Sequence, residues 1–219
     1  MDVTGFRVSP GHFSKRHGLI FIIFLGKAVI SIGIGASGLA TDSKVLIPCL
    51  LDLGIIVAMW WTYFDVNALV AERRLRALSG VQQVWLASHA YMHAHLPMIM
   101  GAIFFSLGVK KTLAHTDEVL SIVPAAALCG GLILYLLGQV GLRVRCGRSL
   151  AWPRIVAVLA LGALIGVSGE IEALALLSAV SLVFALLVAY ETVSREPLGG
   201  ESDQTRLLSG ASRKTGDSN

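Results

Sequence analysis

A lysine and an aspartate lie in the middle of two long apolar runs of this sequence. Lys27 interrupts the run from residue 18 to 40, and Asp52 lies inside the run from 45 to 64. A charged side chain at the centre of a bilayer costs roughly 2.5 to 3.5 kcal/mol on insertion scales, so such charges usually pair or mark an ion pathway. At 1.5 Å per residue from opposite edges of the membrane, the two residues lie within about 6 Å of the same depth. The sequence therefore predicts an intramembrane charge site at Lys27 and Asp52.

Two interpretations of this charge site remain open. In the first, the two charges neutralise each other inside a helix bundle and have no further role. In the second, they form part of an ion or proton path. A third interpretation, in which Lys27 snorkels to the membrane surface, requires a long reach from a nearly central position.

Three histidines form a second polar group within SHAYMHAHLPM, residues 88 to 98. His89 and His93 are four residues apart and share a helix face, which is the spacing that lets two imidazoles ligate one metal ion. His95 points about 200° away from His93 on a regular helix, and Pro97 predicts a kink beside them. Because no carboxylate adjoins the histidines, a hydrogen-bonded contact between helices is a commoner explanation than a metal site. We expect no resident metal or cofactor.

The sequence carries no positive signal for an enzyme. It contains no Gly-rich phosphate loop, nucleophile elbow or HExxH motif. We expect that the protein is not an enzyme, and an intramembrane metalloenzyme built on the histidines is the one enzymatic hypothesis that remains.

The elements that position these residues are predicted to be membrane-spanning helices. The chain has 219 residues, of which 55% are hydrophobic and 15% charged, and its mean hydropathy is +0.73. Such a composition is too apolar for a soluble domain, and runs of about 20 apolar residues are long enough to cross a bilayer. Six spans are predicted, at residues 18–40, 45–64, 84–109, 119–142, 152–168 and 172–191. The predicted fold class is an all-α integral membrane protein with a bundle of about six transmembrane helices.

Basic residues orient these predicted spans. When the loops are assigned to alternate sides and Lys27 is left out, fourteen basic residues fall on one side, and only Lys44, Lys110 and Lys111 fall on the other. Because basic residues stay in the cytoplasm, both termini are predicted to be cytoplasmic. The tryptophans, which favour the membrane interface, are all assigned to the same cytoplasmic face: Trp60, Trp61, Trp85 and Trp152. The net charge of +4 is thus explained by the lipid bilayer as partner, and we expect no nucleic-acid binding.

Three regions follow from this pattern. Residues 1–17 are predicted to be a cytoplasmic N-terminal segment, 18–191 the six-span transmembrane domain, and 192–219 a disordered cytoplasmic tail rich in Ser, Gly and charge. A cleaved signal peptide is the alternative for the first span, but its apolar core is long and five more spans follow it. Gly162 and Gly166 have the spacing of small residues that lets the fifth and sixth spans approach closely.

Three stretches together resemble the bacterial low-temperature-requirement A (LtrA) family of multi-pass membrane proteins. They are HFSKRHGLIFIIFLGKAVISIG from His12, WWTYFD from Trp60, and HLPMIMGAIFFSLGVKKTL from His95. The resemblance implies a multi-pass protein of the bacterial plasma membrane that supports growth at low temperature, and it implies no settled substrate or reaction. It also implies that this chain corresponds to the carboxy-terminal half of a longer protein, so self-association or a missing N-terminal half is an expected partner.

Two positions depart from the family pattern. Where this chain has Lys15 and Lys27, the resemblance implies glutamate, so a base replaces the usual central acid. Our leading hypothesis is that the protein moves a small ion or solute past Lys27, Asp52 and the histidines. The rival hypothesis is a non-transporting structural or assembly subunit whose charges only fix helix contacts.

Overall fold

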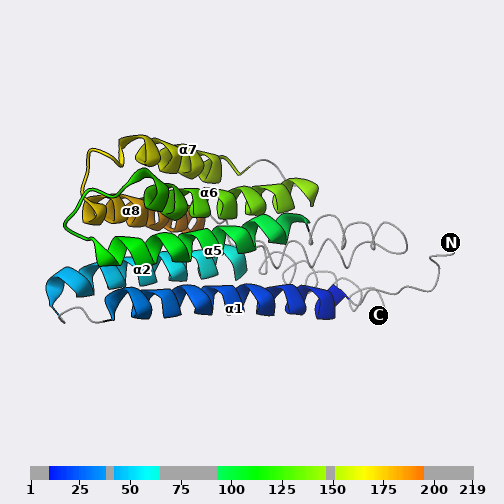
Figure 1. Ribbon diagram of the computed structural model, residues 1–219. Helices are drawn as coiled ribbons and strands as arrows, with labels where there is room; N and C mark the ends of the chain where they lie inside the picture. The colour runs from blue at the N-terminus through cyan, green and yellow to red at the C-terminus, as the bar shows by residue number, and fades with distance from the viewer. Residues whose placement is uncertain (1–9, 38–41, 65–92, 147–150, 195–219) are drawn as a thin grey trace, which may run out of the picture. The chain divides into compact units, whose positions relative to one another are not determined.

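The computed structural model describes residues 10–37, 42–64, 93–146 and 151–194, and these residues form helices (Figure 1). The helices are α1 (Pro10–Ala36), α2 (Ser43–Thr62), α5 (His93–Ala114), α6 (Ile122–Arg145), α7 (Trp152–Val167) and α8 (Ala173–Val193). These ranges contain no β-strand, and their one β-type contact is an isolated bridge between Val119 and Glu172. The all-α prediction is confirmed.

Five of these helices are long and apolar enough to cross a membrane: α1, α2, α5, α6 and α8. The sixth, α7, has 16 residues and a length of about 24 Å at 1.5 Å per residue, which is shorter than the roughly 30 Å of hydrocarbon. Each helix overlaps one of the six predicted spans. The largest differences in the bounds are that α1 begins at Pro10 and that α5 continues to Ala114, whereas the predicted residues 84–92 of the third span lie outside the described part of the chain.

Ring and side-chain contacts set the directions of the first three described helices. The Phe21 ring in the N-terminal half of α1 stacks on the Tyr63 ring directly after α2, with centroids 4.3 Å apart, and Gly18 of α1 lies beside the Phe64 ring, so these helices are antiparallel. His17 of α1 contacts His95 near the start of α5, so α1 and α5 are parallel. We call the end with Thr62 and His95 the Trp60 end, and the end where α2 begins the Lys44 end.

Four glycines form the closest contact between helices, where α5 meets α6. A Cβ added at Gly108 would lie 2.6 Å from the Leu128 Cα, and one added at Gly101 would lie 2.5 Å from the carbonyl oxygen of Gly131. A Cβ at Gly138 would likewise meet the Ala94 carbonyl oxygen at 2.9 Å. Only hydrogen at these positions lets the two backbones approach so closely, as in other small-residue membrane interfaces.

Gly162 and Gly166, the pair predicted to let two helices approach closely, have a different environment. A Cβ built at Gly162 or Gly166 of α7 would meet no described atom within 4 Å. The expectation that this pair brings α7 and α8 together is therefore wrong, because both glycines point away from the neighbouring helices. The spacing of small residues was informative, but it does not say which face a helix turns inward.

Two loops join at the Lys44 end. The backbone N–H groups of Ala173 and Leu174, at the start of α8, donate to the carbonyl oxygens of Glu118 and Thr116 at 2.9 and 3.2 Å. These bonds satisfy donors that a helix N-terminus would otherwise leave unpaired. The start of α8 is thereby fixed to the loop between α5 and α6.

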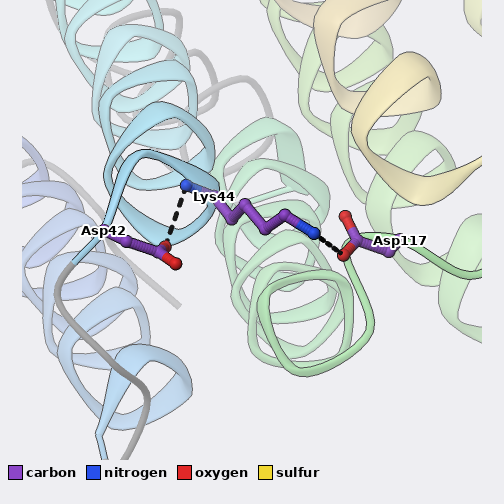
Figure 2. A network of polar contacts seen from close by, with 3 residues as sticks. All are labelled: Asp42, Lys44 and Asp117. Atoms are coloured by element: carbon purple, nitrogen blue, oxygen red, sulfur yellow. Dashed lines mark hydrogen bonds and ion pairs between the residues drawn. The ribbon is translucent and has the colours of Figure 1, made fainter.

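Asp42 and Lys44 connect α2 to the same loop (Figure 2). The Asp42 carboxylate accepts from the Lys44 N–H at 3.0 Å and caps the start of α2, and the Lys44 Nζ lies 2.8 Å from the Asp117 Oδ2. Both charged side chains are more than half exposed, so water screens this ion pair and it contributes little to stability.

The chain divides into two units, Met1–Val188 and Ala189–Asn219. The first contains the helices up to most of α8, and the described part of the second is the end of α8 to Ser194. Most of the predicted tail, from residue 195 onward, lies outside the described residues.

Candidate functional site

Asp52 lies on the buried face of α2. The buried residues of this helix recur every three or four positions: Pro48, Asp52, Ile55, Ile56, Ala58, Met59 and Thr62. Asp52 belongs to this stripe, because Pro48 four positions before it and Ile55 three positions after it lie on the apolar face that the helix turns into the bundle. Its relative exposure is 0%, and neither carboxylate oxygen has a hydrogen-bond partner among the described residues.

Lys27 does not meet Asp52. The Lys27 Nζ donates to the Ser106 Oγ of α5 at 3.1 Å, and Lys27 lies on the exposed side of α1. No ion pair joins Lys27 to Asp52 in the described residues. The two charges that the sequence places at similar depth are therefore separated by the directions of their side chains, and no described cation pairs with the buried carboxyl of Asp52.

The structure describes two of the three histidines of the predicted polar cluster. His89 lies outside the described residues, His93 is exposed at the start of α5, and His95 is 3% exposed. The described residues contain no group of three or more His, Cys, Asp or Glu side chains placed to hold a metal ion. His95 instead contacts neighbouring helices.

His95 takes part in a cluster of rings at the Trp60 end. Its Nε2 is hydrogen-bonded to the Tyr63 hydroxyl at 2.6 Å, and its ring packs edge-on against that of His17 with centroids 4.8 Å apart. Phe21 stacks on both Tyr63 and Tyr135, at 4.3 and 5.6 Å between centroids. The cluster joins α1, α5 and α6 to the residue that follows α2.

A buried hydrogen-bond network adjoins this ring cluster, and the sequence analysis did not identify it. The Tyr135 hydroxyl donates to the Met59 carbonyl oxygen at 2.6 Å and lies 2.9 Å from the Thr62 Oγ1. The Gln139 Nε2 donates to the same two hydroxyls, at 3.4 Å for Thr62. Tyr135 and Gln139 are polar residues four apart in an apolar span, and that spacing was the available signal.

The surroundings of Asp52 on α2 thus differ from those at the Trp60 end. At the Trp60 end, Thr62, Tyr135 and Gln139 bond to one another, whereas Asp52 lies ten residues from Thr62, or about 15 Å along α2. Ile55, Ile56 and Met59 occupy the buried face between them. Asp52 is therefore separate from the hydrogen-bond network at the Trp60 end, and apolar side chains of α2 lie between the two.

A family model covers nearly the whole chain. The model of the bacterial low temperature requirement A protein (LtrA) matches residues 2–189. The chain belongs to the LtrA family. The resemblance drawn from three short stretches is confirmed, and together with the apolar helices it shows that this LtrA-family chain is a multi-pass membrane protein.

Comparison with curated proteins gives a relative of different length. An uncharacterized protein of Rhizobium meliloti (strain 1021) is 29% identical over 148 residues, which cover 67% of this LtrA-family chain and 36% of the relative. The matched region thus spans about a third of the relative's length. No solved structure matches the chain.

Proposed function

We propose that this LtrA-family protein moves a small ion or solute across the bacterial plasma membrane and that Asp52 is the intramembrane carboxyl on which this movement depends. The observation that carries the proposal is the complete burial of Asp52 with no partner for its carboxylate oxygens in the described part of the chain. An uncompensated buried charge costs several kcal/mol in a protein interior. Ionisable residues kept at that cost inside membrane spans commonly mark substrate, ion or proton pathways.

We further propose that both termini are cytoplasmic and that the Lys44 end faces away from the cytoplasm. The support is the distribution of basic residues, because fourteen of them assign to the side of the termini. In this orientation Asp52 lies nearer the outer surface than the cytoplasmic one. An ion reaching it from outside crosses the shorter distance.

Ion flux into proteoliposomes tests the proposal. Purified wild-type protein is expected to carry a pH- or ion-gradient-dependent flux that Asp52→Asn abolishes, since the amide cannot change its charge. Asp117→Asn is the matched control, because it removes the same group from an exposed loop position and is expected to leave the flux unchanged. Wild-type flux no greater than that of empty vesicles contradicts the proposal.

One observation favours a second candidate, a structural or assembly subunit. Lys27 is exposed in the middle of α1, where the bilayer would otherwise surround its ammonium, and its hydrogen bond goes to a neutral hydroxyl. A partner helix carrying a carboxylate would neutralise it. This candidate predicts a stoichiometric partner that native mass spectrometry detects with wild type and not with Lys27→Ala, whereas a lone wild-type monomer in mild detergent counts against it.

A further inference from the structure

We infer that the ion taken up at Asp52 is a proton, so that Asp52 is a membrane-embedded carboxylic acid that binds and releases H⁺. This inference rests on the proposed function, because it names the ion that the same residue would carry. It begins with two observations on α2: the side chain of Asp52 is 0% exposed, and no donor of the described residues lies within hydrogen-bond distance of either oxygen.

The surroundings of Asp52 favour the neutral acid over the carboxylate. A carboxylate in an apolar interior is stabilised by a cation, by several donated hydrogen bonds or by a metal ion, and without them the group takes up a proton instead. The cation at the most similar depth, Lys27, is held by Ser106. A proton is the ligand that removes the charge without requiring any further protein group.

The described residues do not supply a clustered ligand shell for a metal cation, because they contain no group of three or more His, Cys, Asp or Glu side chains placed to hold one. Hard cations such as Ca²⁺ take six or more oxygen ligands. The Ser31 Oγ of α1 donates to its own helix at the Lys27 carbonyl oxygen, and the Ser106 Oγ of α5 donates to the Ile103 carbonyl oxygen. Within α1, α2, α5 and α6, Asp52 is the only Asp or Glu, so this position suits a proton better than a metal ion that needs several anionic or oxygen ligands.

Several other titratable side chains lie on α2 and on the helices around it, and one of them, Lys44, is exposed at the start of α2. On α2 itself, Cys49 lies three residues before Asp52 and is half-buried. The described titratable groups on the neighbouring helices are Arg16, His17 and Lys27 on α1, His93, His95, Lys110 and Lys111 on α5, and Cys129, Tyr135, Arg143 and Arg145 on α6. Lys110 and Lys111 are exposed, and His17, His95 and Tyr135 belong to the Trp60 end. Lys27 and Cys129 are thus the groups to monitor as alternatives to Asp52.

Dicyclohexylcarbodiimide tests the inference, because this apolar reagent reacts with protonated carboxyls inside membranes. The acid proton passes to one carbodiimide nitrogen while a carboxyl oxygen bonds to the central carbon, and the resulting O-acylisourea rearranges to a stable N-acylurea without losing any atom. Mass spectrometry of wild-type protein in native membranes is expected to find one such adduct on the peptide with Asp52. The adduct is expected to be lost in Asp52→Asn and kept in Asp117→Asn.

The pH and salt dependence of labelling separates a proton from a metal cation. Labelling of Asp52 is expected to persist to higher pH than labelling of the exposed Asp117, and to be the same in sodium chloride and choline chloride. Protection by sodium, or no adduct on Asp52 at the lowest pH at which the protein stays folded, overturns the inference. Because labelling needs no transport, flux without labelling refutes the proton alone, whereas labelling without flux supports the protonatable site and refutes the transport function.

Discussion

The directions of side chains separate two charges that the sequence places at similar depth in the membrane. Lys27 lies on the exposed side of α1 and bonds to Ser106, while Asp52 is buried on α2 without a partner. A pair of charges that neutralised each other would explain both residues as structure. Because they do not meet, Asp52 needs another explanation, and the protonation that we propose supplies one.

A double-mutant cycle measures this separation. Lys27→Ala and Asp52→Ala are expected to change the free energy of unfolding additively, within about 0.5 kcal/mol, because the two groups share no contact. Lys27→Ala and Ser106→Ala are expected to be coupled by about 0.5 kcal/mol or more, because their side chains are hydrogen-bonded. Denaturant titrations in detergent measure both cycles, and a coupling of about 1 kcal/mol or more between Lys27 and Asp52 contradicts this arrangement.

The hydroxyl of Tyr135 is expected to stabilise the Trp60 end. Tyr135→Phe removes the donor to the Met59 carbonyl oxygen and leaves buried polar groups of Thr62 and Gln139 with fewer partners. We expect it to lower the free energy of unfolding by about 1 to 3 kcal/mol. Thermal unfolding in detergent measures the loss.

A matched tyrosine provides the control for this substitution. Tyr190 of α8 is 57% exposed, and Tyr190→Phe is expected to change stability by less than about 0.5 kcal/mol, as is usual for surface positions. Equal effects of the two substitutions contradict a special role for the buried network.

At the scale of elements, the contact between α5 and α6 organises the bundle. Glycines on both helices let the backbones touch, so the two helices pack over most of their lengths. Close backbone approach gives dispersion contacts that do not depend on excluding water, which matters where lipid surrounds the protein. This contact holds α5, which carries Ser106 and His95, and α6, which carries Tyr135, in fixed register.

Adjacent glycines on α6 test this contact. A Cβ at Gly131 would meet the Phe105 backbone nitrogen and the Gly101 carbonyl oxygen, the latter at 2.7 Å, whereas a Cβ at Gly130 meets no described atom within 4 Å. Gly131→Ala is expected to lower the free energy of unfolding by about 1 to 3 kcal/mol, because the helices must move apart. Gly130→Ala is expected to be neutral or to stabilise by up to about 1 kcal/mol, because alanine favours the helix. Unfolding in detergent measures both, and equal effects refute the close contact.

At the scale of the whole molecule, the described helices of the first unit alternate in direction. α2 ends and α5 begins at the Trp60 end, and the bridge between Val119 and Glu172 places the starts of α6 and α8 together at the Lys44 end. Counted with the short α7, which connects the end of α6 to the start of α8, six passes of the chain and the basic residues on the side of the termini predict that both termini are cytoplasmic.

Reporter fusions check this topology. A fluorescent protein that matures only in the cytoplasm is expected to be bright when fused to either terminus. Alkaline phosphatase, which is active only outside the cytoplasm, is expected to be active when inserted in the loop at Asp117 and inactive at the C-terminus. Phosphatase activity both at Asp117 and at the C-terminus refutes the even number of crossings. Activity at the C-terminus together with inactivity at Asp117 refutes the orientation.

The sequence by itself determined the fold class and most of the helix positions. Apolar runs long enough to span a bilayer leave the backbone one local way to satisfy its hydrogen bonds, so α2 and α7 begin and end close to their predicted bounds. The LtrA family was also within reach, because three short stretches carried the resemblance. Asp52 was identified as a candidate from its residue type and depth alone.

Only the tertiary structure decided which residues meet. Depth along a helix is a local property, but the face that a helix turns inward depends on every neighbour at once. That is why Lys27 reaches Ser106 and not Asp52, and why the close glycine contact lies at Gly131 and not at Gly162. The hydrogen bonds of Tyr135 to α2 could not be predicted for the same reason, because they join residues more than 70 positions apart in the sequence. Packing between distant segments, rather than any local pattern, gave Asp52 its burial and left its carboxyl without a partner.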